Sequence, residues 1–337
     1  MTGGGDCPGL NAVIRAVVRR AVRDHGDQVV GFLDGWQGLV ESRWRDLDVT
    51  ATRGLLPRGG TMLGTSRTTP GLLDDGLVRA KATYEELGLD AVIVIGGDGT
   101  LAAAHRFTLL GARVVGVPKT IDNDVAGTEH TFGFVTAVQI ATDLIDRLHT
   151  TAESHDRVMV VEVMGRHTGH VAAHAGLAGG ATVTLVPEQP FDIEQVCERL
   201  QRRHDRGRWA SIVVVAEGAR PAPGTLDVPE PRLDVWGRPV LMGAGSLVAA
   251  EIEARTGFET RVTVLGHVQR GGTPTAYDRV LCSRLGVAAV DAVHEGRLDH
   301  MVALRSDRIV AVPLAEVVGR EKPLAEEVWE AANVFFS

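Results

Sequence analysis

The chain has 337 residues, 44% of them hydrophobic, which exceeds one ordinary domain and allows two with sizeable buried cores. Its net charge of −8 gives no general attraction to nucleic acid or to an anionic membrane, and no apolar run approaches the length of a membrane span. The three cysteines have no metal-ligand spacing, and the chain opens directly on glycines rather than on a signal peptide. We therefore expect a cytoplasmic protein with reduced thiols and with neither nucleic acid nor membrane as a partner.

Short apolar runs alternate with amphipathic patterns along the chain. The runs predict strands at residues 29–33, 91–95, 114–117, 158–163, 182–186, 212–216 and 262–265. The amphipathic patterns predict helices that include residues 10–25, 77–87 and 134–149. This alternation is typical of βαβ units and predicts an α/β fold with largely parallel sheets. Five prolines between Pro221 and Pro239 predict a surface excursion over residues 220–239.

The beginning of the chain is unusual. A glycine-rich turn such as Gly3-Gly4-Gly5 is normally fed by a strand, yet only Met1 and Thr2 precede it. We expect a shortened N-terminus, and lower stability, because loss of a buried strand exposes the hydrogen-bonding groups of its neighbours.

Residues 96–100 read Gly-Gly-Asp-Gly-Thr between an expected strand and an expected helix. Backbone N–H groups at such a turn approach phosphate oxygens closely, and the helix dipole favours their negative charge. Asp98 adds a hard oxygen ligand for a Mg²⁺ ion that bridges phosphates. The pattern indicates a nucleotide-phosphate site, but lipid kinases and NAD kinases carry a similar string.

A second strand-to-loop junction carries two carboxylates. The apolar run at 112–117 leads into 118–124, which contains Asp122 and Asp124. Open α/β sheets bind ligands where parallel strands end, and phosphoryl transfer to an alcohol needs one carboxylate to accept the hydroxyl proton. Both aspartates could instead cap the next helix. Combined with the glycine turn upstream, the catalytic interpretation is favoured.

Eight motifs in this order resemble the 6-phosphofructokinase family, over nearly the whole chain. They lie at residues 3–11, 59–67, 96–100, 118–124, 163–166, 216–218, 265–272 and 277–279. The resemblance is closest to the actinobacterial, mixed-substrate branch, in which Lys119 replaces a glycine of the common bacterial enzymes. It implies two Rossmann-like lobes with the active site between them. A nucleotide-binding lobe is expected at 1–133 plus 269–320, and a fructose 6-phosphate lobe at 134–268 plus 321–337.

The resemblance also implies catalytic roles. Asp122 would be the base that deprotonates the 1-hydroxyl of fructose 6-phosphate, supported by Asp124. Thr120 would donate its hydroxyl to the phosphoryl group in flight, and Arg67 would offset charge on it. Asp98 would hold Mg²⁺. The expected ATP-binding residues are Gly5, Arg67, Thr68, Gly97, Asp98, Gly99 and Thr100. If these motifs stood alone, Arg67 could be a surface ion pair and Thr120 a turn residue.

Sugar phosphate binding is implied for a further set of residues. His267 and Arg270 resemble a clamp for the 6-phosphate, and Glu217 resembles an acceptor for a sugar hydroxyl. Arg157 and Arg261 match positions that reach into the neighbouring subunit's site, which implies a homo-oligomer, commonly a tetramer, with a dimer as the alternative. The full set is Thr120, Ile121, Asp122, Arg157, Met164, Gly165, Arg166, Glu217, Arg261, His267, Val268, Gln269 and Arg270.

Two residues bear on the phosphoryl donor. Pyrophosphate-using relatives carry aspartate at the position of Gly99, where it fills the space for the α-phosphate of ATP. Lys119 matches the lysine with which those enzymes stabilise the transferring phosphate. Because steric exclusion outweighs one added cation, we expect Mg-ATP as the donor and a glycolytic kinase that makes fructose 1,6-bisphosphate. The alternatives are a pyrophosphate-dependent phosphofructokinase and, more distantly, a catalytically impaired assembly subunit.

Overall fold

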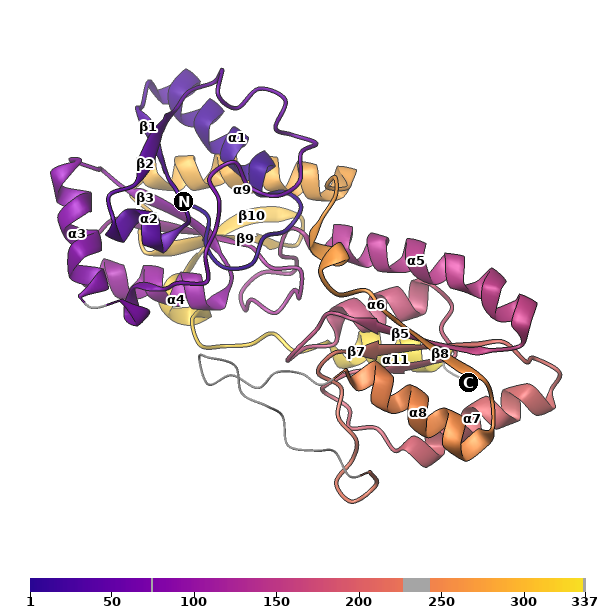
Figure 1. Ribbon diagram of the computed structural model, residues 1–337. Helices are drawn as coiled ribbons and strands as arrows, with labels where there is room; N and C mark the ends of the chain where they lie inside the picture. Colours follow the sequence, from indigo (N-terminus) through magenta and orange to yellow (C-terminus); the bar gives the residue numbers. More distant parts are fainter. Residues whose placement is uncertain (74, 227–242, 336–337) are drawn as a thin grey trace. The chain divides into compact units, whose positions relative to one another are not determined.

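A computed structural model describes residues 1–73, 75–226 and 243–335, and the chain divides into two compact units (Figure 1). Unit 1 comprises Met1–Thr136 and Arg270–Lys322, and unit 2 comprises Ala137–Gln269 and Pro323–Ser337. Of the surface excursion expected at 220–239, residues 227–239 lie outside the described part. No helix in the described ranges combines the length and apolar character needed to cross a membrane.

Unit 1 contains two separate sheets within its described residues. The larger has the order β10-β9-β4-β3, in which β3 (Val92–Gly96), β4 (Val114–Pro118) and β9 (His300–Arg305) are parallel. Strand β10 (Arg308–Pro313) is antiparallel to β9. The smaller is an antiparallel pair, β1 (Val29–Phe32) and β2 (Trp44–Leu47).

Helices of unit 1 cover these sheets (Figure 1). Their buried faces are rich in Ala, Val and Leu, and Trp36 packs edge-on against Phe107 with ring centroids 5.7 Å apart. The helices are α1 (Leu10–Arg20), α2 (Trp36–Val40), α3 (Gly76–Glu86), α4 (Asp98–Thr108), α9 (Ala276–His294) and α10 (Leu314–Val317), with a 3₁₀ turn at Pro70–Leu72.

Unit 2 is built on a parallel sheet with the order β6-β7-β5-β8 among its described residues. Strands β5 and β7 are buried along their whole length, and Val-rich side chains pack under α7 and α8. The strands are β5 (Val158–Val163), β6 (Val183–Leu185), β7 (Ser211–Ala216) and β8 (Thr260–Val264). The helices are α5 (Phe134–His155), which starts in unit 1, α6 (His170–Ala178), α7 (Ile193–Asp205), α8 (Ala244–Thr256) and α11 (Glu326–Asn333), with a 3₁₀ turn at Gly266–Arg270.

A buried carboxylate fixes the start of α5. Asp278 of α9 accepts hydrogen bonds from the backbone N–H groups of Gly133 (3.0 Å) and Thr136 (2.8 Å) and from the Thr136 hydroxyl (2.5 Å). Burial raises the pKa of Asp278, and these three donors oppose the rise. The Tyr-Asp-Arg motif at 277–279 therefore has a structural role inside unit 1.

The α/β fold with largely parallel sheets is confirmed, and every strand predicted from an apolar run is present within two residues of its expected bounds. The helix expected at 10–25 is α-helical only to Arg20 and continues as a π turn at Ala21–His25. The helix expected at 134–149 runs on to His155. The three cysteines are buried and free, and burial raises the pKa of Cys7 to about 12.

Candidate functional site

The glycine turn after β3 leads directly into α4, as expected. The backbone N–H groups of Thr100 and Leu101 both donate to the Gly97 carbonyl at 3.0 Å, which begins the helix. Asp98 and Gly99, its first two residues, are exposed. The helix start thus presents backbone N–H groups and one carboxylate at the carboxyl end of β3, an arrangement suited to a phosphate group and its cation.

The opening glycine turn lies beside this helix start. The Gly3 N–H donates to the Ile95 carbonyl (2.9 Å), and the Gly4 N–H donates to the Ser66 carbonyl (3.0 Å). The Thr65 hydroxyl returns a hydrogen bond to the Gly4 carbonyl (2.7 Å). Three segments far apart in the sequence therefore meet at one end of the unit 1 sheet.

Arg67 and Thr68 follow directly on this contact. The Thr68 N–H donates to the Ser66 hydroxyl (3.2 Å), and the Arg67 side chain is exposed. An arginine held by its backbone beside a glycine turn can extend over a bound phosphate chain.

Lys119 is buried beneath the opening turn. Its Nζ donates to the Gly5 carbonyl at 2.5 Å, and its own N–H donates to the Gly96 carbonyl at 2.9 Å. Burial lowers the pKa of Lys119, while the nearby carboxylates of Asp122 and Asp124 act in the opposite direction. This lysine therefore ties two glycine turns together and adds a cation under them.

The aspartate loop is ordered by its own polar groups. The Asp122 N–H donates to the Thr120 hydroxyl (3.0 Å), and the Thr131 hydroxyl donates to the Thr120 carbonyl (2.7 Å). Asn123 has a φ of 54° and accepts a hydrogen bond from the Thr131 N–H (2.9 Å). Ile121 is fully buried and anchors the loop. Asp122 and Asp124 remain partly exposed and can meet a substrate.

Lys322 holds this loop from the far end of unit 1, and sequence reasoning missed it. Its Nζ donates to the Asn123 amide oxygen (2.9 Å) and to the carbonyls of Thr128 (2.9 Å) and Glu129 (2.7 Å). Its N–H donates to the Asp124 carbonyl (2.9 Å). Burial lowers the pKa of Lys322 to about 8, opposed by Asp124 and Glu129. Nothing in the spacing of the sequence connects residue 322 with residues 123–129.

Arg270 lies against the opening turn of unit 1. Its Nη1 donates to the Asp6 carbonyl (3.2 Å), and a Cβ at Gly5 would lie only 2.5 Å from that nitrogen. A side chain at Gly5 would therefore displace the Arg270 guanidinium, which lies beside the glycine turn.

In unit 2 the expected sugar residues gather at the carboxyl ends of three strands. The Met164 N–H donates to the side-chain oxygen of buried Gln269 (3.3 Å). The Glu217 N–H donates to the Val163 carbonyl (2.9 Å), and a Cβ at Gly218 would lie 1.9 Å from a neighbouring carbonyl oxygen. The loops after β5, β7 and β8 are thus packed together. They carry Met164, Gly165, Arg166, Glu217, His267, Val268 and Gln269.

Arg157 and Arg261 lie at the opposite end of that sheet. Arg157 precedes β5, and its guanidinium contacts Glu259 at 2.7 Å, while Arg261 near the start of β8 contacts the same carboxylate. Since β5 has six residues at about 3.3 Å each, roughly 20 Å separates this pair from Met164. The two arginines therefore belong to a different surface from the sugar loops of their own chain.

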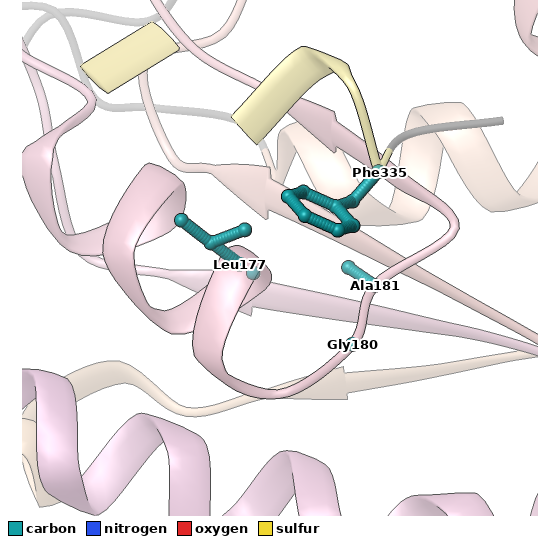
Figure 2. A pocket seen from close by; sticks show the side chains of 5 residues that line it. Leu177, Gly180, Ala181 and Phe335 are labelled. Atoms are coloured by element: carbon teal, nitrogen blue, oxygen red, sulfur yellow. The ribbon is translucent and has the colours of Figure 1, made fainter. Parts of the chain in front are cut away.

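One apolar hollow in unit 2 is lined by no polar side chain. It has a volume of about 350 Å³ and lies between the end of α6 and Phe335, with Leu177 and Ala181 on its walls (Figure 2). Its lining side chains are apolar or absent, so it cannot bind a phosphate or activate a nucleophile. The candidate site is at the strand ends instead.

The comparisons with known proteins agree with this geometry. The family model described as Phosphofructokinase matches residues 1–293. The chain belongs to the phosphofructokinase family. It is 56% identical over 337 residues to a pyrophosphate–fructose 6-phosphate 1-phosphotransferase from Streptomyces coelicolor, covering 100% of this chain and 98% of the relative. It is also 56% identical over 333 residues to ATP-dependent 6-phosphofructokinase 3 of the same organism. That match covers 99% of this chain and 98% of the relative.

Solved phosphofructokinases share the fold. The structure of Pichia pastoris phosphofructokinase in the T-state matches with a TM-score of 0.84 and 33% identity. The match covers 100% of this chain but 36% of the yeast chain. This phosphofructokinase therefore corresponds to about a third of the yeast protein's length.

Proposed function

We propose that this protein is an ATP-dependent 6-phosphofructokinase that transfers the γ-phosphoryl group of ATP to the 1-hydroxyl of fructose 6-phosphate. The observation that carries the choice of donor is the open space at Gly99. A Cβ added there would meet no atom within 4 Å, so the start of α4 leaves room for the α-phosphate. Relatives at 52–54% identity, among them one from Corynebacterium efficiens, are also named ATP-dependent. In this proposal the protein acts in glycolysis, and we expect it in the cytoplasm.

In this proposal, unit 1 binds the phosphate chain of ATP. The opening turn with Gly5, the helix start at 97–100 and the Arg67–Thr68 segment would surround the phosphate chain. Asp98 fits Mg²⁺, because its carboxylate is exposed at the helix start and one of its oxygens is oriented by the Gly319 N–H (3.2 Å). Mg²⁺ is commonly held by one or two carboxylates together with substrate phosphates, and its charge would offset that of the phosphates.

The aspartate loop would perform the proton transfer. Asp122 would accept the proton of the sugar hydroxyl, and the Thr120 hydroxyl, which already orients the Asp122 N–H, would contact the transferring group. Asp124, whose carbonyl is fixed by Lys322, would support the base. Arg67 and Lys119 would offset the charge that develops on the phosphoryl oxygens.

The strand-end loops of unit 2 would bind the sugar phosphate. Glu217 would accept a hydrogen bond from a sugar hydroxyl, and His267 and Arg270 would contact the 6-phosphate. Arg157 and Arg261, at the other end of the sheet, would complete the site of a second copy of the chain. We therefore propose a homo-oligomer, with a tetramer as the expected form.

A pyrophosphate-dependent reaction is the second candidate, favoured by buried Lys119 and by the names of two relatives. Initial rates with fructose 6-phosphate, Mg²⁺ and either ATP or pyrophosphate decide between them. Turnover with ATP at least tenfold above that with pyrophosphate is expected. Turnover with pyrophosphate alone would overturn the proposed donor, and turnover with neither would indicate an assembly subunit.

A further inference from the structure

A short segment of unit 1, residues 319–322, contacts both parts of the candidate site that carry carboxylates. It directly follows α10, whose leucine and valine side chains are buried in the core of unit 1. At one end, the Gly319 N–H donates to a carboxylate oxygen of Asp98 (3.2 Å). At the other end, Lys322 contacts the aspartate loop after β4. One segment fixed to the core therefore touches the start of α4 and the aspartate loop.

The backbone of this segment pairs with the aspartate loop. The Lys322 N–H donates to the Asp124 carbonyl (2.9 Å), and Glu321 forms an antiparallel bridge with Val125. The Val125 side chain is buried in the same apolar cluster as Val317 of α10. The loop is therefore held both by backbone pairing and by packing against the core.

The Lys322 ammonium group joins the two halves of the loop. A lysine ammonium has three N–H donors and no acceptor. Its Nζ donates to the Asn123 amide oxygen in the first half and to the carbonyls of Thr128 and Glu129 in the second half, at 2.9, 2.9 and 2.7 Å. The same Asn123 oxygen accepts from the Thr131 N–H (2.9 Å). Three donors thus meet three acceptors of the loop.

Strand β9 fixes the second half of the loop. The Glu129 N–H donates to the Leu304 carbonyl (2.9 Å), and the Leu304 N–H donates to the Thr128 hydroxyl (3.0 Å). Because Lys322 bonds to both halves, it extends this constraint from the sheet to the first half of the loop.

The first half of the loop carries the two candidate catalytic carboxylates. Asn123 stands between Asp122 and Asp124 with a φ of 54°, so the backbone turns sharply there. The directions of both carboxylates depend on this turn, whose side chain Lys322 holds. A misplacement of about 1 Å at a reacting group can cost about 10²-fold in rate. A support for this turn therefore bears on the rate of phosphoryl transfer.

We propose that Lys322 is a positioning residue for phosphoryl transfer, which holds Asp122 and Asp124 in fixed positions relative to Asp98 through the 319–322 segment. This rests on the proposed function, which assigns those carboxylates to the base and to Mg²⁺. The three donors of Lys322 are used by the loop, so the ammonium has none left for a substrate. Removal of the ammonium should therefore slow the transfer step and leave substrate binding nearly unchanged.

The test compares Lys322→Met, which keeps the apolar stem without the ammonium, with Lys322→Arg, which keeps the charge and the donors. Lys81→Met is the matched control, because Lys81 pairs with Glu85 along α3 (3.3 Å), away from the loop. Values of kcat and KM are measured well below the melting temperature. Hydrogen exchange without substrate is followed by mass spectrometry in peptides that cover residues 120–132 and 317–324.

Lys322→Met should lower kcat by about 10–10²-fold, change each KM by less than about threefold, and speed exchange in both peptides by about tenfold. Lys322→Arg should keep at least about a third of the original kcat, since its guanidinium can donate to the same loop oxygens. Lys81→Met should change none of these quantities.

The proposal is overturned if Lys322→Met leaves kcat or the exchange rates unchanged, or if Lys322→Arg is as slow as Lys322→Met. A loss confined to KM would also overturn it. Should Lys322→Met fail to fold, Lys322→Gln, which retains two N–H donors, is held to the same criteria for kcat and exchange. Failure of the proposed function is distinct, because the unmodified protein would then turn over fructose 6-phosphate with neither donor.

Discussion

The substitution Gly99→Asp tests the proposed donor most directly. Gly99 is exposed near the start of α4, its φ is not positive, and a Cβ there meets nothing within 4 Å. An aspartate can therefore be accommodated without displacing a neighbour. An acidic residue in the first turn of a helix is also favoured by the helix dipole, so the variant should fold.

The substitution Gly99→Asp should weaken the binding of ATP. The new carboxylate would lie where the α-phosphate is expected, and at an effective dielectric of about 20 two like charges about 4 Å apart repel by roughly 4 kcal/mol. That energy corresponds to about three decades in affinity. Gly99→Asp should therefore lower kcat/KM for ATP by about 10³-fold while leaving the KM for fructose 6-phosphate nearly unchanged.

Gly99→Asn is the matched control, because it adds the same volume without the charge. Initial rates are measured for the unmodified protein and both variants, with ATP and with pyrophosphate, at saturating fructose 6-phosphate. Lys119 allows some pyrophosphate turnover in the Asp variant. If Gly99→Asp keeps at least a third of the activity with ATP, the α-phosphate does not lie beside this residue and Gly99 does not determine the donor.

Four further outcomes are expected. Asp122→Asn should bind fructose 6-phosphate in calorimetry yet lower kcat by about 10²–10⁴-fold, since a general base is lost; near-normal turnover would make Asp122 structural. Mixing Arg157→Ala subunits with Asp122→Asn subunits should restore part of the activity if sites are shared, whereas hybrids no better than their parents would argue against sharing. Asp278→Ala should lower the free energy of unfolding by about 2–6 kcal/mol, because two buried N–H groups lose their acceptor at about 1–3 kcal/mol each; an unchanged denaturant midpoint would refute this. Activity should fall as pH rises through about 8, where Lys322 loses its charge, and Lys322→Arg should move that limb upward; identical pH–rate profiles would exclude the role.

Lys322 should make the free energy of unfolding rise with pH over the range in which activity falls. Its pKa is about 8 in the folded chain and 10.5 when exposed, so between these values the unfolded chain binds more protons. The free energy of unfolding contributed by this group therefore rises from pH 8 to pH 10.5. A loss of activity over the range in which stability rises cannot be ascribed to unfolding.

Buried parallel strands were predictable because their signal is local. The run at 158–163 is apolar except for one glutamate and coincides with β5. Strands β2, β9 and β10 were missed. β2 is mostly exposed, and the β9–β10 hairpin turns at Ser306 and Asp307, whose positive φ values are more typical of an Asn-Gly or Asp-Gly turn.

The site was predictable only as separate pieces. Each glycine turn and the aspartate loop could be recognised from a few consecutive residues. Their meeting depends on long-range contacts, such as Gly4 with Ser66 and Lys119 with Gly5, that no spacing encodes. Lys322 was not predicted for the same reason. It is a single lysine outside any motif, and it lies nearly two hundred residues along the chain from the loop that it holds.

Overall similarity cannot decide the donor in this family. Two relatives from one organism share 56% identity with this chain and are named for different donors. The decision must therefore rest on a few atoms near the phosphate chain. Lys119 lies buried between two glycine turns, where its hydrogen bond to the Gly5 carbonyl gives it a structural function with either donor. Gly99 makes no comparable contact, because a Cβ at this position would meet no atom of the described residues within 4 Å. Gly99 should therefore determine the phosphoryl donor more strongly than Lys119. A side chain at Gly99 would fill the space expected for the α-phosphate, whereas the cation of Lys119 can serve both reactions.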